Sequence, residues 1–484
     1  MEDQPVTPAG RLFLRPEIDQ IIHCLIGVDA PFEIDRCKAD LASSLLLRHP
    51  RFSSLLIVDT KTSKQHWRPT QVDIDKHLIF VANPVCNGGD NAVNDYLSDL
   101  AVSSSLSTDK PLWEIHILMA HNCAVFRVHH ALGDGISLVK LLLTCCRRED
   151  DANALPMMVS KDEDLKDQEK YNELRATRKR NRTAWATLKL IWLTLLFIFR
   201  FIGKTLWVKD RKTALSGGNG VELWPRKIAT ASFFIQDMKL IKNIIPGCTV
   251  NDVLFGVISY GLSRYLDDVH SSSSNALKNG TKLTGVAFAN LRQQPGVQEL
   301  TELVNGKEGK QWGNRFGMLI LPMTYHKSGS SSNPLDYVKR AKAMIDWKKN
   351  SLEPHLSYCL GHLVMKTFGT KFASLLNYRI LCNTTFTITN VVGPKEEITM
   401  AGKKITNMRV TSSSLPHALT MHMLSYAGKA EMQIMVAKDL IPDPQDLAKC
   451  FEDALKEMKT LAQLAAADAS SGTCAIKIGT QSKP

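Results

Sequence analysis

The sequence lacks the motifs of several large classes of protein. None of its 11 cysteines belongs to a CxxC pair, and only Cys145 and Cys146 are adjacent. This spacing excludes a zinc site and a disulfide framework, and indicates reduced thiols in a cytosolic setting. No GxSxG segment or paired Cys and His motif supplies a covalent nucleophile. The first residues are acidic and proline-containing instead of basic and then apolar, so we expect no signal peptide.

The chain also lacks an uncharged apolar run long enough to cross a bilayer. A spanning helix needs about 20 apolar residues. The most apolar stretch, residues 184–208, is interrupted by Lys189, Arg200 and Lys204, and its uncharged run covers only residues 190–199. At about 100° per residue the three basic side chains fall in one sector of a helix. We therefore predict an interfacial or re-entrant amphipathic helix whose basic side chains attract anionic lipid, the alternative being a transmembrane segment.

The formal net charge of +12 raises the question of a nucleic-acid partner. Much of the basic excess surrounds the apolar stretch, at Arg175, Arg178, Lys179, Arg180, Arg182, Arg200, Lys204, Lys209, Arg211 and Lys212. Basic residues among Trp, Leu and Phe favour a membrane surface over nucleic acid. We expect a membrane-surface partner and no nucleic acid; a solvated basic linker is the alternative.

A short motif carries the most direct indication of chemistry. Residues 129–135 read HHALGDG, an HHxxxDG pattern. The β-branched and aromatic residues before it predict a strand over 123–128, and the apolar stripe after it predicts a helix over 136–143. The motif therefore lies on a tight turn between a strand and a helix.

The side-chain alternation of a strand separates the two histidines of this motif. His130 and His129 point to opposite faces, so only one can enter a given cavity. We predict that His130 is a general base, because imidazole titrates near neutrality and can accept a proton from a hydroxyl, and that His129 supports it. Asp134 is expected to hold the turn, and Gly135 to allow positive φ or close backbone approach. An ordinary buried histidine pair beside an N-capping aspartate is the alternative.

The HHxxxDG pattern resembles that of CoA-dependent acyltransferases, and other stretches narrow the resemblance. They are similar, in the same order, to blocks of the plant-type bifunctional wax ester synthase/diacylglycerol acyltransferase family. These stretches are residues 48–52, 111–114, 251–254, 290–292, 312–317 and 390–394. The similarity runs from about residue 12 to about residue 461. The DFGWG signature of the related plant alcohol acyltransferases is absent.

This resemblance implies an α/β fold with two chloramphenicol-acetyltransferase-like halves, each a mixed sheet flanked by helices. A tunnel would run between them, with His130 midway. The expected organisation is an N-terminal half over 1–150, a basic crossover over 151–225 that contains the apolar helix 184–208, a C-terminal half over 226–466, and a disordered tail over 467–484.

The resemblance also implies an activity, acyl transfer from acyl-CoA to a long-chain fatty alcohol or to diacylglycerol. Acyl-CoA is then a co-substrate, and no permanent cofactor or metal is expected. Transfer would be direct, since no nucleophile motif supports an acyl-enzyme. The implied location is the cytosolic face of the endoplasmic reticulum membrane, with the plasma membrane as the alternative. A soluble acyltransferase for small alcohols and a non-catalytic lipid-binding homologue are the competing hypotheses.

Further site residues are predicted less directly. Thr389 and Asn390 are candidate oxyanion or tunnel residues, although both residue types are also common in turns. By analogy with the superfamily, Arg292 is a candidate partner of Asp134. Asn251 is a candidate tunnel residue, and it is equally explained by the start of a helix predicted over 251–266.

Overall fold

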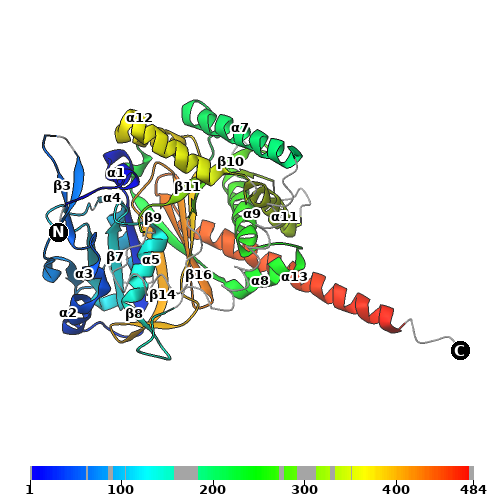
Figure 1. Ribbon diagram of the computed structural model, residues 1–484. Helices are drawn as coiled ribbons and strands as arrows, with labels where there is room; N and C mark the ends of the chain where they lie inside the picture. The colour runs from blue at the N-terminus through cyan, green and yellow to red at the C-terminus, as the bar shows by residue number, and fades with distance from the viewer. Residues whose placement is uncertain are drawn as a thin grey trace.

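Two large mixed β-sheets, each flanked by helices, form the protein, as the resemblance implied (Figure 1). The computed structural model describes residues 3–61, 64–85, 91–103, 105–156, 184–271, 277–291, 312–327, 333–349 and 351–478. We call the seven-stranded sheet the N-terminal sheet and the six-stranded sheet the C-terminal sheet. A third, three-stranded sheet is formed by β1 (Gln4–Pro5), β4 (Gln65–Pro69) and β3 (Ser54–Val58).

The N-terminal sheet has the strand order β5-β6-β7-β2-β14-β13-β8. Its strands are β2 (Ile21–Val28), β5 (Leu78–Val81), β6 (Trp113–Leu118), β7 (Cys123–His129), β8 (Cys146–Arg148), β13 (Ile398–Met400) and β14 (Lys403–Ser412). The helices of this part are α1 (Pro8–Phe13), η1 (Pro16–Ile18), α2 (Ile34–Ser43), α3 (Leu45–Arg48), α4 (Ala92–Ser103) and α5 (Gly135–Thr144). Every residue of β7 is buried, so the turn that follows it lies deep inside the protein.

The C-terminal sheet has the strand order β11-β10-β12-β15-β16-β9. Its strands are β9 (Arg226–Phe234), β10 (Lys282–Asn290), β11 (Phe316–Thr324), β12 (Phe386–Val392), β15 (Leu419–Tyr426) and β16 (Lys429–Ala437). Its helices are α8 (Ile235–Ile244), α9 (Val250–Ser271), α11 (Pro334–Lys349), α12 (Glu353–Cys382) and α13 (Pro444–Ile478). Apolar side chains of α9 and α13, among them Leu254, Ile258 and Phe451, are fully buried in its core.

The two sheets exchange strands. β13 and β14 follow β12 in the chain but belong to the N-terminal sheet, where β14 pairs antiparallel with β2 and β13 pairs with β8. The chain then returns to the C-terminal sheet with β15. The sheets are therefore held together by covalent crossovers as well as by side-chain packing. The boundaries at 150 and 226 rest on composition and motifs and stay a prediction.

The C-terminal helix is longer than the sequence predicted. We expected disorder from residue 467, whereas the backbone of α13 is helical to Ile478. The expectation rested on the small and polar composition of this segment. Residues 465–467 and 469 are alanines, and because alanine has the highest intrinsic helix propensity, they favour continuation of the helix beyond Leu464.

The predicted apolar helix forms within its expected bounds as α7 (Ala184–Leu206). It lies beside α12 on one side of the molecule (Figure 1). Leu193 and Phe197 face the protein and are buried. No helix in the described ranges is long and apolar enough to cross a membrane.

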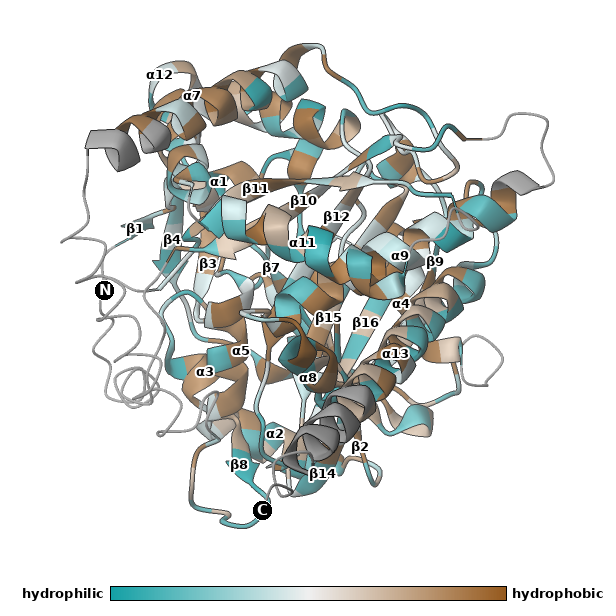
Figure 2. Ribbon diagram, turned by 90° about the vertical axis from the view of Figure 1, so that its right-hand side faces the viewer, coloured by the Kyte–Doolittle hydropathy of each residue, from teal (hydrophilic) through white to brown (hydrophobic). Residues whose placement is uncertain are grey.

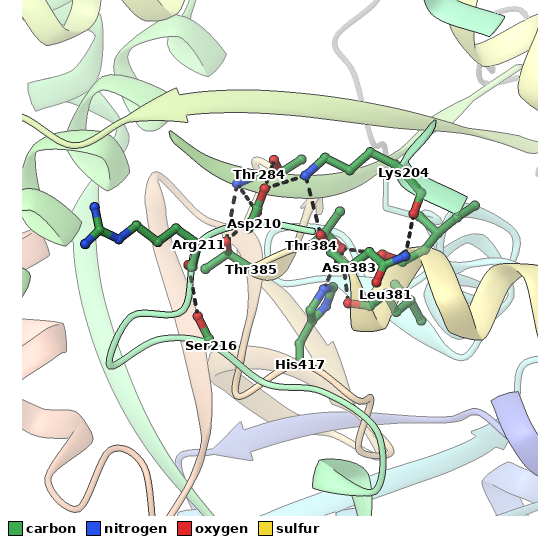
Figure 3. Close-up of polar contacts among 11 residues, drawn as sticks. Lys204, Asp210, Arg211, Ser216, Thr284, Leu381, Asn383, Thr384, Thr385 and His417 are labelled. Atoms are coloured by element: carbon green, nitrogen blue, oxygen red, sulfur yellow. Dashed lines mark hydrogen bonds and ion pairs between the residues drawn. The ribbon is translucent and has the colours of Figure 1, made fainter. Parts of the chain in front are cut away.

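One basic residue of α7 does not face lipid as predicted. Lys204 forms an ion pair with Asp210, and its Nζ lies 3.4 Å from the carbonyl oxygen of Asn383 (Figure 3). Asp210 also accepts hydrogen bonds from the Thr284 backbone N–H at 2.8 Å and the Thr385 hydroxyl at 2.6 Å. Because Lys204 is mostly buried and neutralised by Asp210, it fixes the end of α7 to β10 and β12. Attraction of anionic lipid by Lys204 was therefore a wrong prediction.

The other two basic residues of α7, Arg200 and Lys189, are not known to be neutralised as Lys204 is. The Arg200 side chain is exposed, and its guanidinium lies 5.5 Å from the ring centre of Trp347 on α11. The Lys189 side chain lies outside the described part of the structure. The guanidinium of Arg200 is therefore exposed to solvent on one side and faces an aromatic ring of the protein on the other.

Candidate active site

A cavity of about 270 Å³ lies between the two sheets and contains the HHxxxDG turn. Its wall includes residues of the helices α1, α5 and α12 and of the strands β2, β10, β11, β12, β14 and β15. Most of the lining is apolar and includes Phe13, Phe288 and Phe316. The polar side chains on the wall include His130 and His422. Such a cavity suits an extended apolar substrate that reacts at one polar point.

The site histidine is held where β7 ends. Its backbone N–H donates to the carbonyl oxygen of Gln20 at 2.8 Å. The imidazole of His130 stacks on Phe13, with ring centres 4.1 Å apart, and meets Phe316 edge-on. His130 therefore lines the cavity in one fixed orientation, as the strand alternation predicted.

Asn314 determines which nitrogen of His130 carries the proton. The Asn314 Nδ2 donates to the His130 carbonyl oxygen at 2.8 Å, which leaves its Oδ1 facing the ring. Oδ1 lies 3.1 Å from His130 Nδ1 and can only accept, so Nδ1 carries the proton. The lone pair of Nε2 is then available to a substrate, and burial keeps the ring neutral by lowering the pKa of His130. Asn314 lies in a stretch that resembles the family, but nothing in the sequence connects it to a histidine 184 residues away.

His129 has a different environment. Its Nε2 donates to the Asp19 carboxylate at 2.8 Å, and its Nδ1 accepts from the Ala131 backbone N–H at 3.0 Å. It is buried and does not line the cavity. His129 thus holds the turn in place on the far side of β7 from the cavity.

Asp134 joins the turn to the opposite sheet. One carboxylate oxygen accepts from the Ser137 backbone N–H at 3.1 Å and caps α5. The other accepts from the Arg315 backbone N–H at 3.2 Å. Trp312 supports the same contact, since its Nε1 donates to the Leu132 carbonyl oxygen at 2.8 Å. Arg292 lies outside the described residues, so its pairing with Asp134 stays a prediction.

Gly135 does not adopt the positive φ that the sequence suggested. It opens α5 with a helical backbone, and a Cβ at this position would lie 3.7 Å from a methyl group of Val391. Gly135 and Val391 line both the main cavity and a smaller apolar cavity beside Leu138 and Leu142. Gly135 therefore leaves space open where the two cavities meet.

Thr389, one of the two candidate oxyanion residues, forms part of a hydrogen-bonded chain. Thr389 Oγ1 lies 2.7 Å from Nδ1 of His422, whose Nε2 lies 3.2 Å from Ser412 Oγ. Thr389, His422 and Ser412 all line the cavity. Burial, with a smaller effect of the nearby His130, lowers the pKa of His422 to about 4, so this ring is neutral at pH 7. The sequence analysis missed His422 because no motif surrounds it.

Asn390 and Asn251 meet at the edge of this site. Asn390 also lines the cavity, and its Nδ2 donates to Asn251 Oδ1 at 2.8 Å. The cap of α9 is formed by its neighbours, since Asp252 Oδ2 accepts from the Thr249 N–H at 2.7 Å. Asn251 is therefore not itself the capping residue. Its contact brings two of the family-like stretches together.

The chain matches one family over both of its halves. Residues 33–254 match the wax ester synthase/diacylglycerol acyltransferase catalytic domain, and residues 312–459 match the WS/DGAT C-terminal domain. Wax ester synthase/diacylglycerol acyltransferases 5 and 11 of Arabidopsis thaliana are each 33% identical to it. The alignments cover 96% and 95% of this chain, and 94% and 95% of those relatives. The chain belongs to the wax ester synthase/diacylglycerol acyltransferase family.

Solved structures confirm the fold expected for the family. The wax ester synthase/diacylglycerol acyltransferase from Marinobacter aquaeolei has a TM-score of 0.58 at 17% identity, covering 95% of this chain and 100% of that chain. A trichothecene 15-O-acetyltransferase from Fusarium sporotrichioides has the same TM-score at 10% identity, covering 94% of both chains. The two-halved acyltransferase fold is therefore established for this protein.

Proposed function

We propose that this protein transfers a long-chain acyl group from acyl-CoA to the hydroxyl of a long-chain fatty alcohol, and also to diacylglycerol. The observation that carries the proposal is the neutral side chain of His130 in an apolar cavity between two sheets. Its Nε2 is unprotonated because Asn314 accepts the proton of Nδ1 in a hydrogen bond. The family relatives are named for both products. A soluble acyltransferase for small alcohols is not favoured by the apolar lining, and the intact motif does not favour a non-catalytic homologue.

The reaction needs one proton transfer to His130 and one from it. His130 Nε2 accepts the acceptor's hydroxyl proton as the oxygen attacks the thioester carbonyl carbon. The tetrahedral intermediate then breaks its C–S bond, and the CoA thiolate takes the proton back from Nε2. Ester and free CoA are the products, and the base is regenerated. No covalent acyl-enzyme is required.

Thr389 is positioned to stabilise the negative oxygen of this intermediate. In one tautomer His422 Nδ1 donates to Thr389, and the Ser412 hydroxyl donates to His422 Nε2 at 3.2 Å instead of to the Ser413 carbonyl oxygen at 3.1 Å. The Thr389 hydroxyl proton is then free to point into the cavity. A fixed donor of this kind is worth about 10² to 10³ in kcat. His422 is then a positioning residue that acts through Thr389.

The membrane is proposed as the source of the acceptor. The outer side of α7 exposes a set of large apolar side chains, Leu188, Ile191, Trp192, Leu195, Phe199 and Ile202. An exposed apolar helix face with basic flanks favours the interface of an anionic leaflet. We place the protein on the cytosolic face of the endoplasmic reticulum membrane, with the plasma membrane as the alternative. Protease treatment of sealed microsomes should cleave tags at both termini; protection of one tag would contradict this arrangement.

Purified protein tests the proposed activity directly. A panel of acyl-CoAs is incubated with hexadecanol, with diacylglycerol and with a short soluble alcohol, and ester and free CoA are measured together. We expect long-chain acyl-CoA to yield wax ester and triacylglycerol with equimolar CoA. CoA release without ester, or ester from the short alcohol alone, would overturn the proposal.

A further inference from the structure

A second helix beside α7 also exposes large apolar side chains. On α12 the exposed fractions are 57% for Leu363, 68% for Phe368, 42% for Phe372 and 48% for Leu375. Four large side chains on one helix are more than scattered exposure explains, and such a group marks an interaction surface. The sequence analysis did not single out this helix, because its overall pattern is only weakly amphipathic.

The helices that carry these exposed side chains, α7 and α12, are neighbours. The two helices contact each other and lie on the same side of the molecule in both views (Figures 1 and 2). Figure 2 shows α7 as a largely apolar helix at this outer edge. We call the exposed side chains of α7 and α12 together the two-helix surface.

The charge of this surface identifies its partner. α7 contains no acidic residue, and the only one in α12 is Glu353. Glu353 is buried in an ion pair with Lys348 at 2.6 Å and does not reach the surface. Lys366 and Lys371 of α12 are exposed. Apolar and basic side chains without exposed acid complement an anionic bilayer, whose acyl chains accept the former and whose headgroups accept the latter.

A kink gives α12 two separately anchored parts. Gly369 has φ 82° and ψ 169°, inside a helix. A Cβ there would meet no atom within 4 Å, so the backbone conformation and not lack of space requires glycine. Before the kink, Ser357 accepts from the Met318 N–H at 2.8 Å; after it, the Ser374 hydroxyl lies 3.3 Å from the Glu17 carboxylate. Phe368, Gly369 and Phe372 are thus exposed between two hydrogen-bonded segments of the helix.

The second part of α12 reaches the cavity. Asn377 and Leu381 line the cavity, while Phe372 and Leu375 of the same segment are exposed. α1, which also lines the cavity through Leu12 and Phe13, contacts α12. One helix thus connects the two-helix surface to the site of His130.

We propose that α12 and α7 dock together on an anionic bilayer with the Gly369 kink inserted among the acyl chains. An acceptor dissolved in the bilayer then reaches the cavity along the segment after the kink. This inference rests on the proposed function for the identity of the acceptor, but the docking itself does not depend on catalysis.

Vesicle binding tests the docking surface without any activity. The full chain and a Phe368→Ser/Phe372→Ser variant are sedimented with phosphatidylcholine vesicles that contain or lack phosphatidylserine. We expect the variant to lose about tenfold or more in partition coefficient, since two exposed aromatic side chains no longer enter the bilayer. Phe234→Ser is the matched control, because Phe234 is 58% exposed where β9 meets α8, away from α12. Equal binding of the double variant and the wild type would overturn the proposal, and so would an equal loss in the control.

A second pair of variants tests the charge. Lys366→Gln/Lys371→Gln should weaken binding to vesicles with phosphatidylserine several-fold and leave binding to pure phosphatidylcholine unchanged, and added salt should reduce the difference. Equal effects on both vesicle types would rule out anionic lipid as the partner.

The acceptor route is tested by comparing two acceptors. Phe368→Ser/Phe372→Ser should lose transfer to hexadecanol supplied in vesicles and keep transfer to a short soluble alcohol. Loss of both would contradict a route along α12. Wild-type protein that binds vesicles but transfers no acyl group would refute the proposed function and leave the docking surface intact.

Discussion

At the scale of single residues, the site depends on how two histidines next to each other in sequence are separated in space. His130 lines the cavity, whereas His129 is hydrogen-bonded to Asp19 on the other side of the strand. Asn314 and His422 complete the site from the C-terminal part of the chain. Each of these roles leads to a distinct expectation.

Removing the imidazole of His130 should abolish transfer without unfolding the protein. His130→Ala is expected to lower kcat by about 10² to 10⁴, the usual contribution of a general base. The melting temperature should change little, because the side chain borders a cavity. His129→Ala is the comparison: it should destabilise the protein and reduce the rate less. Near-normal turnover of a well-folded His130→Ala protein would refute the assignment.

Asn314 should control the pH dependence of the rate. Burial holds the pKa of His130 below the ordinary imidazole value, so the neutral base persists as pH falls through that value. Asn314→Asp places a negative charge at Nδ1, which favours imidazolium and should move the acid limb of kcat/KM to higher pH. Asn314→Ala should lower kcat without that shift. An acid limb that is identical in both variants would contradict the positioning role.

His422 should act through one of its two nitrogens. In His422→Asn the amide occupies the place of Nδ1 and can still donate to Thr389, whereas in His422→Gln it occupies the place of Nε2 near Ser412. We expect His422→Asn to keep most of kcat, and His422→Gln to lose as much as Thr389→Val, with KM little changed. Equal kcat values in His422→Asn and His422→Gln would contradict a role of His422 through its Nδ1 contact with Thr389.

At the scale of elements, the strand–turn–helix unit β7–α5 is the part that the sequence predicted best. The predicted strand 123–128 and helix 136–143 correspond to β7 and α5 within one residue at each end. The unit also contacts the segment that leads into β11, because Asp134 accepts hydrogen bonds from the backbone N–H groups of Ser137 in α5 and of Arg315. The Asp134 carboxylate therefore both caps α5 and links the turn to the other half of the protein.

Asp134 variants should separate these two contacts. Asp134→Ala removes the cap of α5 and leaves the Arg315 N–H without this acceptor, which should lower the free energy of unfolding by about 1–3 kcal/mol. Asp134→Asn can still cap α5 through its amide oxygen, and should recover part of that loss. Urea unfolding and acyl transfer are measured together. Unchanged stability with lost activity would instead assign Asp134 a direct chemical role.

At the scale of the whole molecule, several buried histidines make stability depend on pH. Burial lowers the pKa of His49 and His417 to about 3, and of His77 and His422 to about 4. The unfolded chain binds protons at these side chains below about pH 6.5, while the native protein does not. Stability should therefore be complete above pH 6.5 and fall towards pH 4.5, by up to about 1.4 kcal/mol per histidine and pH unit.

Urea unfolding at pH 7, 6 and 5 checks this expectation. Carboxylates ionise mostly below this window, so the slope of unfolding free energy against pH reports mainly on histidines. A His77→Phe variant keeps a ring stacked on Trp113, whose ring centre is 3.9 Å from that of His77, and should reduce the slope by about one proton. A slope unaffected by this substitution would mean that His77 is charged in the native protein.

Much of the site was accessible from the sequence because it is encoded locally. The HHxxxDG spacing, the strand alternation and the helix start are properties of neighbouring residues, so they predicted His130 as the cavity histidine and Asp134 as the residue that holds the turn. The resemblance in several ordered stretches predicted the two-halved fold. The apolar helix was found in the same way, from residues 184–208 alone.

What only the tertiary structure decided involves residues far apart in the chain. Asn314 contacts His130, which lies 184 residues earlier in the chain, and His422 contacts Thr389, which lies 33 residues earlier. Neither contact produces a local sequence pattern. Lys204 is neutralised by Asp210 because β10 and β12 bring Thr284 and Thr385 to the same carboxylate. Hydrogen bonding and burial depend on the complete three-dimensional environment of a side chain, whereas periodicity records only its immediate neighbours in sequence.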